Sequence, residues 1–440
     1  MTSRPIIALL LASALLSGCS VFKKTRIDTP TLGDRINVLS GESAAEVDPA
    51  LANVAVTVPL PEVNADWAQP GGNAMKAMGH VALPASLTPA WSVQIPGSTN
   101  RVKLAAAPVV SDGKLYVVDV DATVHAYDAA SGAVLWTSSI AGDDPDVRNA
   151  LFGGGVSAAG NRVFATNGAG DVAMLDATTG GIIWKVRPSG PLRGSPTLSN
   201  GHVYVMAQDN QLFALNQTDG TQVWQATASI GAGSVFGVGA PAAGQGTVVA
   251  GYSSGELYAY RYENGRDLWG DALARTSFAV SVESLTDVDA SPVIDRGRVY
   301  ALGKGGRMAA YELVTGQRLW ELPIAGISTP WVAGEWVFVV TDQDRLLAVA
   351  RTTGKVRWIS QLPSYRKEES KKGKIRWTGP ILAGNRLILV STLGQMIQVN
   401  PTDGSIIGQT EAGKTFGLSP VAANNMLYLL DDEGRLTAYR

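Results

Sequence analysis

Few residues of this 440-residue chain have a type and spacing suited to chemistry. Its three histidines, His80, His125 and His202, lack the spacing of a metal site, so we expect each to be structural. Residues 251–255 match the Gly-x-Ser-x-Gly pattern of a nucleophile elbow. That elbow requires a strand-to-helix turn, whereas here the strand-like stretch ELYAY follows. The sequence therefore predicts no catalytic residue, no metal site and no cofactor.

The single cysteine, Cys19, stands in a context typical of covalent modification. Arg4 supplies a positive charge, residues 6–16 are apolar, and Leu-Ser-Gly precedes the cysteine. The apolar run is too short to span a bilayer and is typical of a secretory signal. The ending resembles the lipobox of bacterial lipoproteins, which implies cleavage before Cys19 and acylation, as by palmitate; an ordinary signal peptide with a free thiol is the alternative. Ser20, in place of aspartate, implies by the same resemblance sorting to the outer membrane.

Two polar clusters could bind a partner. In TDVDASP, Asp287 and Asp289 come just before a predicted strand. They either cap a turn or dock an arginine or lysine of a partner, where charge complementarity sets specificity. Residues 365–376, YRKEESKKGKIR, form either a solvated loop or a contact to anionic lipid or an acidic partner. The net charge of −2 lacks the basic footprint of a nucleic-acid binder.

A repeat of about 45 residues must position these groups. Short alternating apolar stretches, separated by Asn, Asp and Gly, predict four antiparallel strands in each repeat. A glycine supplies the positive φ of the last hairpin, and a tryptophan four residues later fills the space between neighbouring sheets. Gly408 stands where the frame predicts one more tryptophan. The glycine–tryptophan interval occurs at 132/136, 180/184, 220/224, 265/269, 316/320 and 354/358.

The two ends of the chain predict that the repeats close into a ring. The last repeat supplies three strands before Arg440, and residues 89–95 form a fourth strand with no repeat before it. Pairing these strands removes the edges that an open solenoid, the alternative, would expose. We therefore predict an all-β, eight-bladed β-propeller of four-stranded antiparallel blades, closed by an N-terminal strand that completes the last blade. The eight innermost strands begin at Ala107-Pro108, Gly155-Val156, Ser195-Pro196, Ala240-Pro241, Ser291-Pro292, Thr329-Pro330, Gly379-Pro380 and Ser419-Pro420.

Three segments follow from these patterns. Residues 1–18 are predicted to be the lipoprotein signal peptide, residues 19–88 a lipidated tether partly docked on the propeller, and residues 89–440 the propeller. A flexible coil of this length spans on the order of 45 Å. Trp67 is expected to be an anchor on the folded domain, and a partner site is the alternative. With no further apolar run of 18 residues, we expect no transmembrane helix.

The repeat, clearest in residues 126–136 (AYDAASGAVLW), resembles the tryptophan-docking repeat of pyrroloquinoline-quinone dehydrogenases. Those enzymes carry a vicinal disulfide, and a calcium site of Glu, Asn and Asp beside a catalytic Asp. A chain with one cysteine cannot form that disulfide, and no comparable calcium constellation can be assembled from its sequence. A lipid-anchored quinoprotein dehydrogenase is therefore the alternative function.

The lipobox, the length and the closure by an N-terminal strand resemble the BamB family, propeller lipoproteins of the outer-membrane β-barrel assembly complex. The resemblance implies a non-catalytic scaffold, monomeric within a hetero-complex and held by lipid at the periplasmic face of the outer membrane. It also implies binding to the POTRA domains of the BamA-type barrel subunit, which aids β-barrel insertion. The family's acidic pair corresponds to Asp287 and Asp289. Its second contact loop corresponds to residues 233–241, which offer Val235 and Phe236 but no arginine.

Overall fold

The computed structural model describes residues 45–142, 153–229, 239–273 and 287–440, all within one compact unit from Gly41 to Arg440. Strands make up nearly all of its elements, beside one short 3-10 helix, η1 (Pro49–Leu51). No helix in these ranges is long and apolar enough to cross a membrane. The predicted signal peptide and Cys19 lie outside the described residues.

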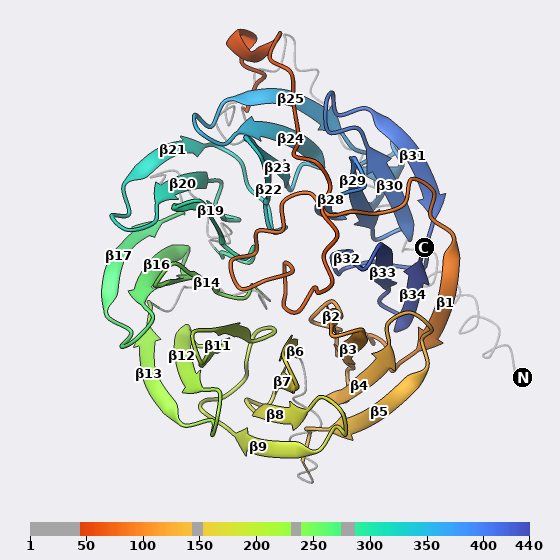
Figure 1. Cartoon of the computed structure of the whole chain (residues 1–440). Coiled ribbons are helices and arrows are strands. Elements are labelled where there is room, and N and C mark those ends of the chain that lie inside the picture. Colours follow the sequence, from red (N-terminus) through yellow and green to blue (C-terminus); the bar gives the residue numbers. More distant parts are fainter. Residues whose placement is uncertain (1–44, 143–152, 230–238, 274–286) are drawn as a thin grey trace, which may run out of the picture. The chain divides into compact units, whose positions relative to one another are not determined.

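The described strands form eight four-stranded antiparallel sheets arranged around a centre, which confirms the predicted propeller (Figure 1). Each blade runs from an innermost strand, which has three residues in six of the described blades and six or seven in the other two, to an outer strand at the rim. The blades, each from the inside outward, are β2 (Val109–Ser111), β3 (Lys114–Val118), β4 (Thr123–Asp128), β5 (Val134–Ser139); β6 (Gly154–Ala159), β7 (Arg162–Asn167), β8 (Val172–Asp176), β9 (Ile182–Val186); β10 (Thr197–Ser199), β11 (His202–Met206), β12 (Gln211–Asn216), β13 (Gln222–Thr227); β14 (Ala242–Gly244), β15 (Thr247–Gly251), β16 (Glu256–Arg261), β17 (Asp267–Ala272); β18 (Val293–Asp295), β19 (Arg298–Leu302), β20 (Met308–Glu312), β21 (Arg318–Leu322); β22 (Trp331–Ala333), β23 (Trp336–Val340), β24 (Arg345–Ala350), β25 (Val356–Gln361); β28 (Trp377–Ala383), β29 (Arg386–Ser391), β30 (Gln395–Val399), β31 (Ile406–Glu411); and β32 (Val421–Ala423), β33 (Met426–Leu430), β34 (Arg435–Tyr439), β1 (Pro89–Gln94).

The ring closes where the predicted N-terminal strand meets the last three strands. β1 pairs antiparallel with β34, with Trp91 opposite Ala438. Just beyond the strands, Thr88 and Arg440 exchange backbone hydrogen bonds of 2.8 and 3.0 Å. The last blade is therefore assembled from both ends of the propeller sequence, as predicted.

Seven repeat tryptophans each lie against the hairpin glycine of the following blade. A Cβ atom at these glycines would lie 2.4–2.8 Å from an atom of the tryptophan, and their φ angles are +69° to +77°. Each indole N–H also donates to a backbone carbonyl of that next blade at 2.8–3.1 Å. The tryptophans thus join neighbouring sheets, as predicted. The pairs are Trp91–Gly132, Trp136–Gly180, Trp184–Gly220, Trp224–Gly265, Trp269–Gly316, Trp320–Gly354 and Trp358–Gly404.

The absence of a ring at Gly408, on β31, follows from the ring closure. The next blade is the split one, in which the two outer strands, β34 and β1, come from opposite ends of the propeller sequence. No hairpin joins these two strands, so no hairpin glycine stands there to receive a tryptophan from β31. The eighth interface between blades is therefore built differently from the other seven.

Residues 45–88 lie on the propeller. The segment begins beside β25, where Val47 bridges to Val356, crosses the centre of the ring and then continues into β1 (Figure 1). Trp67 exchanges backbone hydrogen bonds of 2.7 and 2.9 Å with Val110 on β2. A flexible coil therefore does not describe residues 45–88, and residues 19–44 of the predicted tether lie outside the described ranges.

Residues 64–81, which we call the central segment, are hydrogen-bonded to the innermost strand of every blade. Short innermost strands would otherwise turn unpaired backbone groups toward the centre of the ring, which is unfavourable away from water. The central segment satisfies part of these groups and connects all eight blades at one place. The contacts are Trp67 with Val110, Ala68 with Ala158, Gln69 with Leu198, Ala74 with Ala243, Met75 with Ile294, Gly79 with Trp331, Val81 with Leu382 and Asn64 with Ala422.

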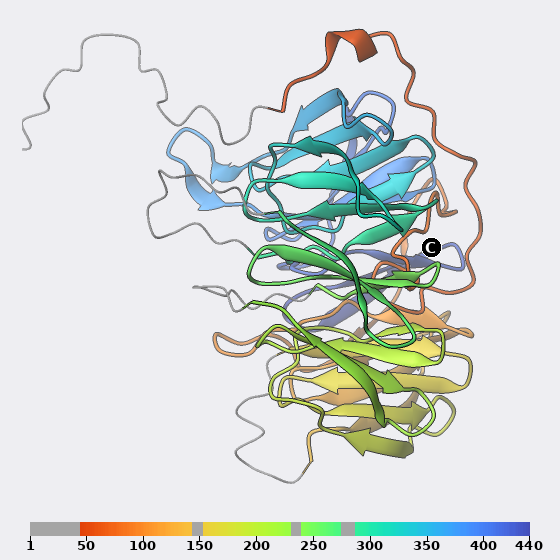
Figure 2. The ribbon, with the colours of Figure 1, turned by 90° about the vertical axis from the view of Figure 1, so that its left-hand side faces the viewer.

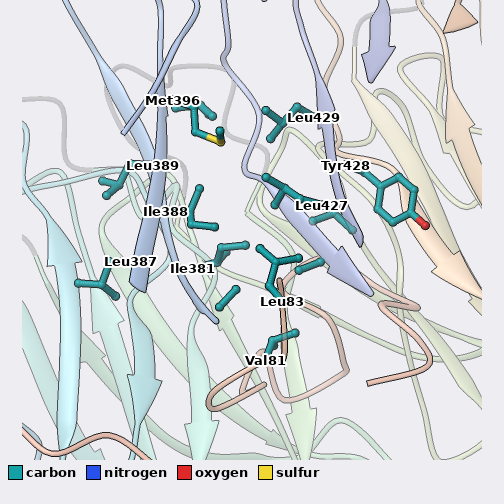
Figure 3. Packing of buried hydrophobic residues seen from close by; sticks show 14 of the residues in the cluster. Val81, Leu83, Ile381, Leu387, Ile388, Leu389, Met396, Leu427, Tyr428 and Leu429 are labelled. Atoms are coloured by element: carbon teal, nitrogen blue, oxygen red, sulfur yellow. The ribbon is translucent and has the colours of Figure 1, made fainter. Parts of the chain in front are cut away.

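Apolar packing also holds this part of the chain. Val81 and Leu83 lie beside Ile381 on β28 and Leu427 on β33 (Figure 3). The Trp67 side chain is 3% exposed, and its ring stacks on that of Trp331 with the centroids 5.8 Å apart and the planes 15° from parallel. Trp67 is therefore buried against the folded domain, as expected of an anchor.

The basic stretch forms a two-stranded hairpin of β26 (Tyr365–Lys367) and β27 (Lys372–Lys374). It projects from the side of the ring opposite to residues 45–88 (Figure 2). Its side chains are mostly exposed, while Lys374 pairs with Asp344 and lies 5.2 Å from the ring centroid of Tyr365. The predicted solvated loop is thus a solvated hairpin.

Candidate functional site

The acidic loop, residues 287–289, leads into β18 and packs on the turn between β15 and β16. The Val288 backbone N–H donates to the Tyr252 carbonyl at 3.1 Å, and the Lys304 N–H donates to the Asp287 carbonyl at 2.9 Å. The Val288 side chain is 1% exposed. These contacts fix the loop to two neighbouring blades, so its carboxylates are held in defined positions.

The two aspartates of this loop differ in accessibility. Asp287 is 0% exposed, whereas Asp289 is partly exposed, and its Oδ1 has no hydrogen-bond partner among the described residues. Burial, and then the charge of Asp287, raises the pKa of Asp289 to about 6, although the charges of Lys304 and Arg193 oppose this shift. Direct contact with a partner can therefore involve Asp289, while Asp287 lies beneath the surface.

A buried arginine accompanies the acidic loop. Arg193 is 1% exposed, and its charge interacts with those of Asp287 and Asp289. Burial lowers the pKa of Arg193, while the two carboxylates act in the opposite direction. The sequence contains a signal for this residue that our reasoning from sequence did not use. Arg193 and Asp289 both stand three residues before the proline of a strand start, so they are equivalent positions of two repeats.

Hydrogen bonds connect this arginine to the next blade. Arg193 Nη2 donates to Asn210 Oδ1 at 2.8 Å, and the same oxygen accepts from the backbone N–H and hydroxyl of Ser253 at 3.1 and 2.9 Å. Ser253 belongs to the turn between β15 and β16. The Gly-x-Ser-x-Gly match is therefore a strand-to-strand turn, as predicted, and its serine helps to hold two blades together.

Val235 and Phe236, the apolar residues of the second predicted contact loop, lie outside the described residues. The end of that loop is described, and it lies against the acidic loop. A Cβ atom at Gly239 would lie 2.6 Å from the Asp289 carbonyl oxygen. The Ala240 N–H donates to Ser291 Oγ at 3.1 Å. The two stretches singled out from sequence thus meet at Asp289.

A central cavity of about 340 Å³ lies between the central segment and the loops that lead into the innermost strands. Trp67 and Lys76, both from the central segment, line its buried end. Ile327 and Arg376, both exposed, line it at the lead-in loops. Asp289 also lines this cavity, so the acidic loop borders the hollow centre of the ring.

The three histidines have structural partners. His80 Nε2 accepts from the Asn385 N–H at 2.8 Å, which leaves Nδ1 to donate to the Pro59 carbonyl at 2.6 Å. His125 lies 2.7 Å from Asp119, and the ring of His202 packs beside that of Tyr204. Across the four described ranges, no three His, Cys, Asp or Glu side chains are grouped as they would be to hold a metal ion.

Comparison with solved structures supports the fold. BamB from Moraxella catarrhalis superposes with a TM-score of 0.66 at 20% identity, covering 81% of this chain and 98% of that chain. A europium-containing methanol dehydrogenase gives a TM-score of 0.68 at 12% identity, covering 85% and 98%. At such identities the likeness concerns the fold alone, so it gives no support to dehydrogenase activity in this protein.

Comparison of sequences shows the family. A family model described as "Outer membrane protein assembly factor BamB" matches residues 81–150 and 120–360. The protein of that name from Yersinia pestis is 26% identical over 358 residues, which are 80% of this chain and 89% of the relative. The one from Escherichia coli strain K12 is 27% identical over 350 residues, 79% and 87% of the two chains. The chain therefore belongs to the family of the outer membrane protein assembly factor BamB, a family of assembly factors and not of enzymes.

Proposed function

We propose that this protein is a non-catalytic, lipid-anchored scaffold that assists outer-membrane protein assembly by binding the POTRA domains of the BamA-type barrel subunit. Its membership in the family supports the role in assembly. The ring itself supports the role of a scaffold. Its blades are joined by tryptophans at the rim and by the central segment at the middle, which favours a rigid platform over a site that must move.

The acidic loop is the observation that carries the proposed partner surface. Asp289 is a fixed, partly exposed residue beside the end of the loop that contains Val235 and Phe236, although its Oδ1 is buried. A partly buried carboxylate is suited to a partner's arginine or lysine, because reduced contact with water strengthens a charge pair. Asp287 then does not contact the partner itself, but its buried carboxylate adds negative charge near Asp289.

The proposed anchor is Cys19, with Ser20 after it directing the protein to the outer membrane. An acylated cysteine that carries several chains would hold the propeller stably, because a single acyl chain binds a membrane only marginally. The protein would then face the periplasm, where the POTRA domains lie.

The test is capture of the full-length protein from detergent-solubilised outer membranes, with proteins in the eluate identified by mass spectrometry. We expect the BamA-type subunit as a near-stoichiometric partner. An eluate in which other envelope proteins are abundant and the barrel subunit is absent would contradict the proposal.

A further inference from the structure

The basic hairpin, residues 365–376, concentrates positive charge in a chain that is otherwise acidic. It holds six basic and two acidic residues, a formal charge of +4, so the rest of the chain, which has a net charge of −2 as a whole, carries −6. Among the described residues, only Lys374 of the six basic residues forms an ion pair, with Asp344. The six basic side chains are all exposed: Arg366, Lys367, Lys371, Lys372, Lys374 and Arg376.

The basic hairpin is fixed to the ring at its base. The Ile375 N–H donates to the Ser364 carbonyl at 2.8 Å, and Trp377 Nε1 donates to the Pro363 carbonyl at 2.8 Å. The side chains of Ile375 and Trp377 are both buried. The Glu368 carboxylate accepts from the Ser364 N–H at 2.9 Å, so one of the two acidic groups is turned back toward the base. The positive side chains are therefore held at a defined place on the ring.

The basic hairpin and the acidic loop lie on the same side of the ring. Each belongs to a connection from the outer strand of one blade to the innermost strand of the next, from β25 to β28 and from β17 to β18. In a four-stranded antiparallel blade, the turns after the first and third strands lie at the opposite end. Residues 45–88 contact turns at that opposite end, as Pro59 does at Gly334 and Asp48 does at Lys355. The hairpin and the proposed partner surface therefore share the side away from residues 45–88 (Figure 2).

The tip of the hairpin suits a flat, charged surface better than a protein partner. Residues 366–374 contain no large apolar side chain, whereas the core of a protein–protein interface is depleted of charge and rich in aromatic residues. The hairpin also projects from the ring, so its charges can approach a plane while the acidic remainder stays farther away (Figure 2). A membrane that contains anionic lipid attracts clusters of about four to eight basic residues through its surface potential. Charge and shape together therefore favour a membrane surface.

We propose that the basic hairpin contacts an anionic phospholipid surface and so turns this side of the ring toward the membrane. The headgroups supply phosphate oxygens, which accept charge-assisted hydrogen bonds from exposed lysine and arginine side chains. The inference goes beyond the proposed function and rests on it in one respect, since the acyl anchor at Cys19 would keep the membrane within reach. The 25 residues between Cys19 and Ala45 extend over at most about 90 Å. The acidic loop would then face the membrane in which the barrel subunit lies.

Sedimentation with lipid vesicles tests the proposal on the full-length Cys19→Ala chain, which cannot be acylated at that position, so the hairpin is measured apart from the proposed anchor. We expect this chain to bind vesicles with about 30% phosphatidylglycerol at least about ten-fold more tightly than vesicles of phosphatidylcholine alone. Any binding through the apolar residues 6–16 is common to both vesicles and cancels in the comparison. Raising the salt concentration to about 0.5 M should remove the preference, because salt screens exposed charges.

A triple variant of this chain isolates the contribution of the hairpin. Lys367→Gln, Lys371→Gln and Lys372→Gln together neutralise three exposed side chains that make no ion pair among the described residues. We expect binding to the anionic vesicles to weaken at least about ten-fold and binding to the neutral vesicles to stay the same.

The matched control removes three positive charges from the other side of the ring. Arg162→Gln, Arg266→Gln and Arg296→Gln together change exposed residues in turns at the end of the blades that residues 45–88 contact. This variant should bind the anionic vesicles nearly as the parent chain does. Thermal denaturation verifies that both triple variants are folded.

Equal binding of the parent chain to anionic and neutral vesicles, unchanged binding after the loss of the three lysines, or an equal loss in the two triple variants would overturn the proposal. No binding to vesicles of either kind would also overturn it, and would leave an acidic protein as the partner of the hairpin. Because the anchor takes no part in these measurements, they can fail while the capture of the barrel subunit succeeds, and the reverse.

Discussion

The indole ring of Trp136 on β5 lies directly on Gly180, the hairpin glycine of the next blade. A Cβ at Gly180 would lie 2.5 Å from Trp136 Cε3, and Trp136 Nε1 donates to the Ala177 carbonyl at 3.1 Å. The repeat glycine therefore does two things. It adopts a positive φ for its own hairpin, and it leaves room for the tryptophan of the preceding blade.

The substitution Gly180→Ala should lower the free energy of unfolding by about 2–4 kcal/mol, because it combines a strained φ with a clash against a packed ring. The matched control is Gly160→Ala. Gly160 also has a positive φ, of +54°, but no atom lies within 4 Å of its Cβ position. This variant should lose only about 1 kcal/mol. Urea unfolding measures the free energy of unfolding of both variants. Equal losses of free energy would show that the contact between Trp136 and Gly180 does not add to the cost of the substitution.

The central segment should contribute to the stability of the whole ring. Trp67→Ala removes a buried ring that stacks on Trp331, so we expect a loss of about 3–5 kcal/mol in the free energy of unfolding. Leu60→Ala, at an 85% exposed position of the same stretch, should change it by less than about 0.5 kcal/mol. A loss at Trp67 as small as that at Leu60 would mean that the segment lies on the ring without stabilising it.

The periodic part of the fold could be predicted from sequence because its signals are local. The interval from Gly132 to Trp136 predicts both a hairpin and the strand that follows it, and the same interval recurs along the chain at a spacing of about 45 residues. The closing strand, with Trp91, follows from the same frame, since a lone fourth strand must pair with a blade that lacks one. That the hairpin glycine also leaves room for a tryptophan could be seen only in the structure, because this tryptophan belongs to the preceding repeat.

The non-periodic parts could not be predicted in the same way. The contacts of Gln69 with Leu198 and of Asn64 with Ala422 join residues more than a hundred positions apart and follow no repeat. Likewise, a charged residue such as Asp287 is normally exposed, and only its packing in the folded protein buries it. Sequence therefore singled out the acidic pair, while the difference in burial between its two aspartates required the structure.

The raised pKa of Asp289 predicts an unusual dependence of stability on pH. Its folded-state value of about 6 lies above the ordinary 3.8, so ionising this carboxyl lowers the stability of the folded protein as pH rises from about 4 to about 6. Asp289→Asn removes that cost. The variant should therefore melt at a higher temperature than the wild type at about pH 7.5, with the difference shrinking toward about pH 4. Scanning calorimetry at both pH values measures this.

The control for the pH experiment is Asp121→Asn at an exposed position. Its effect on the melting temperature should be small at both pH values. The opposing outcome is a difference in melting temperature between Asp289→Asn and the wild type that is the same at about pH 7.5 and about pH 4. That result would contradict the burial of Asp289 as the cause of its raised pKa.

The proposed anchor predicts a change of compartment. Cys19→Ala removes the thiol that would be acylated, so the variant should incorporate no labelled palmitate and should leave the outer-membrane fraction. Cell fractionation and metabolic labelling measure these two properties. The contradicting outcome is a Cys19→Ala protein that still sediments with outer membranes that lack the barrel subunit, because something other than the lipid or this partner would then hold it there.

The most direct test of the account is the affinity of the purified protein for the POTRA domains of the barrel subunit, measured by titration. Asp289→Arg places a like charge against the partner's basic group and should weaken binding by at least about ten-fold, and a cooperative melting curve verifies that the variant is folded. Glu335→Arg, an exposed charge reversal on the turn between β22 and β23, should bind as the wild type does. Equal affinity of Asp289→Arg and the wild type would contradict the central claim that the acidic loop is the surface on which the partner docks.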